Sequence, residues 1–190
     1  MNKTLNILLL LFSFSAFSQF NYQQGNKYTF GKYNPKAPIQ TQDYKELIGL
    51  SDCMSTSRKP DGTWNTPVKM TWKWSYIMNG MAVQDETLKE DGSHSGSIRQ
   101  YNKDSLQWNV HYYSSKAATK KLRSWSGNKD KKGKIILYMD QKAPNGTEGF
   151  SRLTFYDIND EGYKWVGEWV DKTEKVVFPF WKISCKKRRK

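Results

Sequence analysis

Apolar and polar residues alternate most clearly between Val68 and Tyr76, where every second residue is apolar and the residues between them are lysine, threonine or serine. A period of two is typical of a strand with one buried face. Asn79-Gly80 follows, and both residues tolerate the positive φ that a type I′ turn requires. The pattern therefore predicts a long β-hairpin over Val68–Leu88, in which residues equidistant from the turn lie opposite each other.

This register assigns the two faces of the hairpin. The aromatic residues Trp72 and Trp74 fall on one face together with Asp85, which lies opposite Trp74. On the other face Lys73 meets Glu86, an opposite-charge pair suited to solvent. We therefore expect the aromatic face to point inward and to carry the carboxylate of Asp85 with it.

The rest of the chain repeats this design. Further strands are expected at 48–58, 95–102, 105–115, 119–127, 134–141, 149–158, 162–171 and 175–185, with a short helical turn at 43–50. Short turns join the strands and no long helical pattern intervenes. This favours an all-β fold, a single up-and-down antiparallel barrel of about ten strands, over a two-sheet sandwich.

Pairing across the later turns predicts which side chains share the inner face. Arg99 is expected inward, opposite Trp108, with Asp85 as the nearest carboxylate if the connection at Gly92 has an odd length. Arg152 is expected opposite Trp169.

In the last hairpin, Gly167 is expected opposite Phe178, where the absence of a side chain would make room for the ring.

Three segments resemble a family of uncharacterised, often exported bacterial proteins with a calycin or lipocalin-like barrel. They are Met78–Glu86, Gly96–Tyr101 followed by Trp108, and Arg152–Ile158 followed by Trp165. The resemblance covers about residues 45–185. It implies a calycin-like barrel and no agreed activity.

The amino-terminal residues have the pattern of a signal peptide, with Lys3 and an apolar run before small residues. We expect a signal peptide at 1–18, an extended leader at 19–44, the barrel at 45–185 and a basic tail at 186–190, in a periplasmic or secreted protein. Export permits a disulfide between Cys53 and Cys185, which would join the first and last strands of a closed sheet. The alternative is two unrelated buried thiols.

The chain carries a formal net charge of +13. Lysine and arginine concentrate in Lys116–Lys134 and in the tail Lys186–Lys190. Such clusters could hold anionic glycans or lipid head groups, or simply form a solvated face. We expect a monomer and no specific binding of nucleic acid.

Two histidines without triad partners and two distant cysteines predict no catalytic residues, no metal site and no cofactor, so the sequence favours a protein that is not an enzyme. The inward aromatic and charged residues instead suggest an interior site for a small amphipathic or carboxylate-bearing ligand. The candidate ligand-binding residues are Trp72, Trp74, Asp85, Arg99, Trp108, Arg152, Trp165 and Trp169. Two alternatives remain: these residues only fill a packed core, or the protein is a surface adaptor that holds anionic polymers.

Overall fold

A computed structural model describes residues 20–188 of the chain. The expected signal peptide and the last two residues of the basic tail lie outside this range. The described residues form one 3-10 helix, η1 (Ile39–Leu47), and ten strands: β1 (Gly49–Ser57), β2 (Val68–Ile77), β3 (Ala82–Lys89), β4 (His94–Asn102), β5 (Gln107–Ser114), β6 (Arg123–Lys129), β7 (Ile135–Asp140), β8 (Gly149–Tyr156), β9 (Gly162–Asp171) and β10 (Val177–Lys187).

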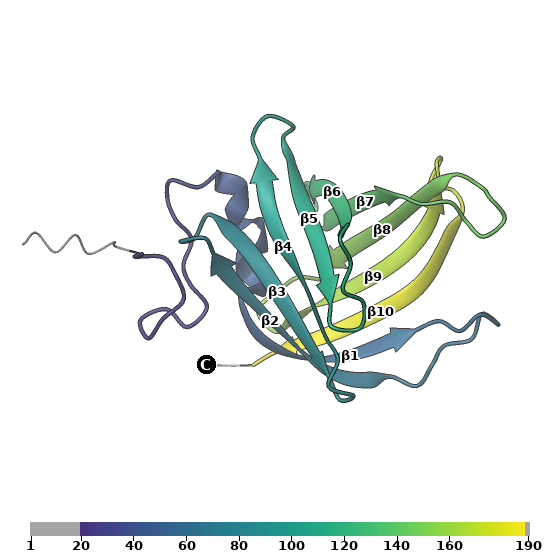
Figure 1. Ribbon diagram of the computed structural model, residues 1–190, viewed down its shortest axis with the longest axis horizontal. Helices are drawn as coiled ribbons and strands as arrows, with labels where there is room; N and C mark the ends of the chain where they lie inside the picture. Colours follow the sequence, from purple (N-terminus) through teal and green to yellow (C-terminus); the bar gives the residue numbers. More distant parts are fainter. Residues whose placement is uncertain (1–19, 189–190) are drawn as a thin grey trace, which may run out of the picture.

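The strands close into an antiparallel barrel (Figure 1). Each strand pairs with its neighbours in the sequence, and β1 also pairs with β10. The predicted up-and-down barrel of about ten strands is therefore confirmed. Closure removes exposed sheet edges, which would otherwise present unpaired backbone groups.

A disulfide joins the strands that close the barrel. Cys53 on β1 lies directly opposite Cys185 on β10, and their sulfur atoms are bonded. The two residues are 132 positions apart in the sequence. In the chain-entropy model, a cross-link of this span stabilises the folded state by about 5 kcal/mol.

The register of the first hairpin is confirmed. Trp74 pairs with Asp85 and Lys73 with Glu86, as the alternation predicts. The turn is wider than a two-residue loop, because the last strand pair is Ile77 with Ala82. Met78, Asn79 and Gly80 all have positive φ, so the Asn-Gly signal identified the turn but not its full extent.

Arg99 faces inward as predicted, but its partner on β5 was predicted wrongly. Arg99 pairs with Val110, and Trp108 pairs with Tyr101. The difference is two residues, because Leu106 adopts a left-handed φ of 53° and belongs to the turn rather than to the strand. A shift of two residues preserves the face of every side chain. Leu88 of β3 pairs with His94 of β4, so an odd number of residues, 89–93, separates the last paired residues, and Gly92 among them has a φ of 75°.

The predicted register between β8 and β9 is wrong by one residue. Arg152 lies opposite Glu168, and Ser151 lies opposite Trp169. The cause is the turn, where Asp157 has a positive φ and the Asn159 side chain accepts hydrogen bonds from two backbone amides. A slip of one residue exchanges the two faces of a strand. Arg152 therefore lies on the outer face.

The predicted register between β9 and β10 is also wrong, by two residues next to the turn and by three beyond a bulge in β10 between Pro179 and Trp181. Gly167 pairs with Trp181, and Phe178 pairs with Trp169. A Cβ atom on Gly167 would lie 3.1 Å from the ring of Phe180. The glycine thus makes room for Phe180 rather than for Phe178.

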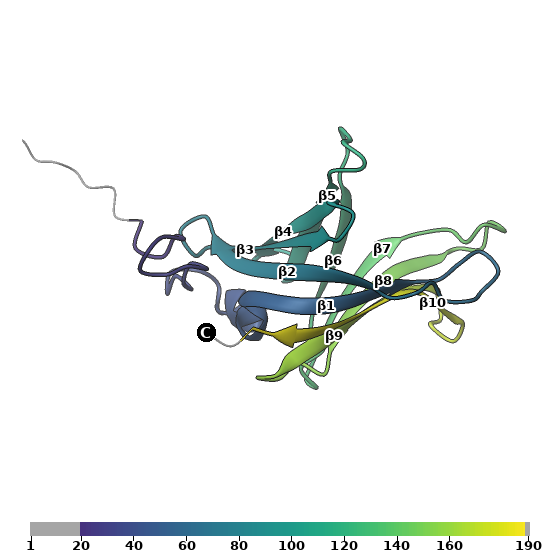
Figure 2. The same cartoon turned by 90° about the horizontal axis from the view of Figure 1, so that it is seen from below.

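The amino-terminal segment and η1 lie at one end of the barrel, next to the carboxyl-terminal end of β10 (Figures 1 and 2). The connections β1–β2, β7–β8 and β9–β10 lie at the other end. The segment is fastened to the β2–β3 turn by hydrogen bonds to Asn79, whose side chain accepts from the Tyr22 amide and whose carbonyl accepts from the Asn34 side chain.

Candidate functional site

One end of the barrel is filled by aromatic side chains. Tyr44 of η1 is fully buried and stacks on Trp74, with ring centroids 5.5 Å apart, and it meets Trp108 edge-on at 4.8 Å. The indole N–H of Trp74 donates to the Tyr163 hydroxyl, and that of Trp108 donates to Asp43. Burial raises the pKa of Tyr44 to about 12 and raises the pKa of Tyr163 as well. This packed layer closes the barrel at the end where η1 lies.

An ion pair borders the packed layer on the side of the barrel interior. Arg99 donates to one carboxylate oxygen of Asp85, and the indole N–H of Trp72 donates to the other at 2.7 Å. The guanidinium of Arg99 also lies 4.5 Å from the ring centre of Trp74, a cation–π contact. Burial lowers the pKa of Arg99, yet the nearby carboxylate supplies the opposite charge that a buried cation requires.

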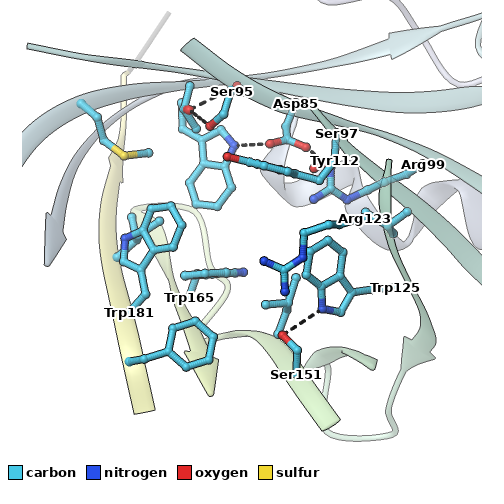
Figure 3. Close-up of a pocket in the computed structure, with 17 residues that line it drawn as sticks. Asp85, Ser95, Ser97, Arg99, Tyr112, Arg123, Trp125, Ser151, Trp165 and Trp181 are labelled. Atoms are coloured by element: carbon cyan, nitrogen blue, oxygen red, sulfur yellow. Dashed lines mark hydrogen bonds and ion pairs between the residues drawn. The ribbon is translucent and has the colours of Figure 1, made fainter. Parts of the chain in front are cut away.

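A cavity of about 200 Å³ borders this ion pair (Figure 3). Four tryptophans surround it. Three of them donate a hydrogen bond from the indole N–H to another side chain: Trp72 to Asp85, Trp125 to Ser151, and Trp181 to Ser55. The fourth is Trp165, which meets Trp181 edge-on at 5.3 Å. The remaining lining residues are Met70, Thr87, Ser95, Ser97, Arg99, Val110, Tyr112, Arg123, Ser151, Leu153, Phe180 and Ile183.

Arg123 brings a second cation to the cavity. It lies at the start of β6, is exposed, and has its guanidinium 5.3 Å from the ring centre of Trp125. Within residues 20–188, its side chain donates one hydrogen bond, to the side-chain oxygen of Gln141 at 3.3 Å. In Figure 3 the guanidinium extends towards the middle of the cavity.

Four of the candidate ligand-binding residues lie together around this cavity: Trp72, Asp85, Arg99 and Trp165. Trp74 and Trp108 also face inward, but both are fully buried in the packed layer. They belong to the packed layer that borders the site, and they offer no surface to a ligand.

Two candidates lie away from the cavity. Arg152 is on the outer face, where it is bonded to Glu168 and Glu174. Its assignment as an interior anchor is wrong, for the register reason given above. Trp169 does not line the cavity, and its indole N–H donates to the carbonyl of Gln141.

The alternation of apolar residues did not identify several cavity residues. Trp125 and Arg123 lie on β6. This short strand has a single large apolar residue, so its pattern did not indicate which face points inward. Phe180 and Trp181 both line the cavity although they are adjacent in the sequence, which a regular strand would not allow. A bulge explains this, and Pro179 was the one sequence signal that could have suggested it.

The basic stretch Lys116–Lys134 extends along β6. Lys116 and Lys121 precede the strand, Arg123 and Lys129 are its first and last residues, and Lys131 and Lys134 follow it. Seven residues of strand separate these groups by roughly 20 Å. Lys116 is also paired with Asp91 at 2.7 Å.

Within residues 20–188, no group of three or more histidine, cysteine, aspartate or glutamate side chains is placed to hold a metal ion. None of the helices in the same range has the length and apolar character needed to cross a membrane.

The sequence matches no protein-family model and no curated protein. Solved structures with a similar fold include the Rv2717c protein of M. tuberculosis, at 10% identity and a TM-score of 0.51, over 81% of this chain and all of that one. An S-type phycobiliprotein lyase, CPES, from Guillardia theta matches at 6% identity and a TM-score of 0.49, over 80% of this chain and 99% of that one. The similarity to Rv2717c, together with the closed sheet, supports the predicted fold of a calycin-like barrel.

Proposed function

We propose that this protein is an exported calycin-like barrel that binds one small, flat, mostly apolar molecule in its interior. The observation that carries this proposal is the cavity of about 200 Å³ surrounded by the indole rings of Trp72, Trp125, Trp165 and Trp181. Aromatic walls favour a planar ligand, because rings in contact gain from offset-stacked and edge-on arrangements. The few polar groups on the wall, including Ser97 and Tyr112, would fix its orientation.

The size of the cavity limits the ligand. Pockets for drug-sized molecules typically measure roughly 300 to 1,000 Å³, so this cavity suits a smaller molecule of one or two rings. A bulky polycyclic or tetrapyrrole molecule would require the walls to move.

The disulfide supports export, since disulfides persist in oxidising compartments and are rare in the cytosol. We therefore propose that the protein belongs with the exported bacterial barrels that its sequence resembles, and that it acts in the periplasm or outside the cell.

The alternative, a surface adaptor that holds anionic glycans or lipid head groups, has less support. It assumed a closed, packed barrel with basic stretches outside, whereas the barrel contains a cavity.

Isothermal titration calorimetry with two probes of suitable shape, neutral 1-naphthamide and anionic 1-naphthoate, tests the proposal. Both are expected to bind at a single site. Ser97→Leu would fill the cavity, since Ser97 is buried, lines the wall and makes no side-chain hydrogen bond within residues 20–188. Loss of binding of both probes in this variant is the expected result.

Ser126→Leu is the matched control, because Ser126 lies on β6 between the inward Trp125 and Gly127 and does not line the cavity. It should bind both probes like the unmodified protein. Failure of both probes to bind the unmodified protein, or undiminished binding in a folded Ser97→Leu variant, would overturn the proposed function.

A further inference from the structure

Arg123 differs from the other described arginines in its partners. Arg99, Arg152 and Arg188 each form an ion pair with a carboxylate. Arg58 donates to two backbone carbonyls. Arg123 has only the amide oxygen of Gln141 at 3.3 Å, so most of its planar array of donors is available.

The charges around the cavity do not balance. Its lining includes three side chains with a formal charge, namely Asp85, Arg99 and Arg123. Asp85 and Arg99 neutralise each other in their ion pair. The cavity is therefore left with one positive charge, which belongs to Arg123.

Trp165 offers a second donor to the same space. Its side chain is buried at the cavity wall, and its indole N–H donates no hydrogen bond within residues 20–188, unlike those of the other three cavity tryptophans. Figure 3 shows the indole nitrogen of Trp165 and the guanidinium of Arg123 both directed towards the middle of the cavity.

We propose that the ligand is a planar aromatic monoanion, whose carboxylate accepts hydrogen bonds from Arg123 and Trp165 while its rings lie among the indoles. This names the ligand class for the proposed function and rests on it. A guanidinium matches a carboxylate in shape and can donate two parallel hydrogen bonds to it. A single unbalanced positive charge matches a monoanion better than a phosphate dianion.

The test compares the affinities of 1-naphthoate, 1-naphthamide and 1-naphthyl phosphate by titration calorimetry. Naphthoate is expected to bind about tenfold more tightly than the isosteric amide, the usual advantage of a charge-assisted hydrogen bond. Arg123→Gln should remove this preference, so that naphthoate and naphthamide bind with similar affinities. Trp165→Phe, which retains a ring, should weaken naphthoate binding by about threefold.

Lys121→Gln is the matched control, because it removes an exposed positive charge two residues away from Arg123 that does not line the cavity. It should leave the preference for naphthoate intact. Equal affinities for naphthoate and naphthamide, or tighter binding of the phosphate, would overturn the inference and leave the interior site standing. A lack of binding by all three probes would instead overturn the proposed function.

Discussion

Arg99 and Asp85 form an ion pair inside the barrel, with side chains that are 3% and 4% exposed. They lie on adjacent strands, β4 and β3, two residues apart in the register, because Asp85 pairs with Ser97 and Arg99 pairs with Val83. The pair separates the packed aromatic layer around Tyr44 from the cavity, since Arg99 contacts the ring of Tyr44 and both charged residues also line the cavity. It therefore serves the stability of the barrel and the shape of the site together.

Breaking this pair should destabilise the protein strongly. Arg99→Met would leave the Asp85 carboxylate buried without its counter-charge, and such losses typically cost about 3 to 5 kcal/mol of the free energy of unfolding. The double variant Asp85→Leu with Arg99→Met removes both charges and should recover much of that loss. Urea unfolding measures both effects.

The Lys73–Glu86 pair is the matched control, because it joins neighbouring strands, β2 and β3, on the outer face at 3.6 Å. Lys73→Ala should cost less than about 1 kcal/mol, since exposed ion pairs contribute little. Similar losses for Arg99→Met and Lys73→Ala would show that the interior pair is not the stabilising contact that its burial indicates.

The barrel and this ion pair were predictable because local signals determined them. The Asn79-Gly80 turn fixed the register of a strongly alternating hairpin, and that register alone placed Asp85 inward. Arg99 was placed correctly even though its partner was wrong, because an error of two residues keeps the face of a strand.

The rest of the site depends on features that alternation does not encode. Arg152 was placed inward because the turn after β8 differs by one residue from the symmetrical turn that the sequence suggests. Arg123 and Trp125 lie on a strand with too few apolar residues to define a face. The bulge in β10 brings two adjacent residues to the cavity, and it depends on packing between β9 and β10.

The buried tyrosines predict a loss of stability at alkaline pH. The pKa of tyrosine is about 10 in an unfolded chain, and burial raises that of Tyr44 to about 12. Between these values the folded protein retains a proton that the unfolded chain has lost, so the free energy of unfolding falls as the pH rises. The stabilising contribution is complete below about pH 10 and declines by about 1.4 kcal/mol per pH unit for each such tyrosine.

Tyr44→Phe tests this pH dependence directly. The Tyr44 hydroxyl is buried and, in the described part of the chain, makes no hydrogen bond of regular geometry, although it interacts with Arg99, so its removal should change stability at neutral pH by less than about 1 kcal/mol. Urea unfolding should then show a shallower decline between about pH 10 and 12 than in the unmodified protein. An unchanged decline would mean that Tyr44 ionises as readily in the folded state as in the unfolded chain.

Gly80 joins the first hairpin to the amino-terminal segment. A Cβ atom at this position would lie 2.2 Å from the Lys32 carbonyl oxygen and 2.7 Å from the Asn34 amide, and the φ of 78° disfavours any side chain. The Asn34 amide also donates to the Gly80 carbonyl at 3.2 Å. Gly80→Ala should therefore cost at least about 2 kcal/mol, from backbone strain and displacement of the segment. Proteolysis of this segment should become faster.

Gly92 provides a control that separates strain from displacement. Its φ of 75° is nearly the same, but a Cβ atom there would have no atom within 4 Å. Gly92→Ala should thus carry only the conformational cost, about 1 kcal/mol, and leave proteolysis of the amino-terminal segment unchanged. The two glycines have nearly the same φ but different surroundings. The difference between the losses of unfolding free energy in Gly80→Ala and Gly92→Ala therefore measures how tightly the segment holds the hairpin. Equal losses in the two variants would mean that the segment yields to the new methyl group at no cost and does not support the closed end of the barrel.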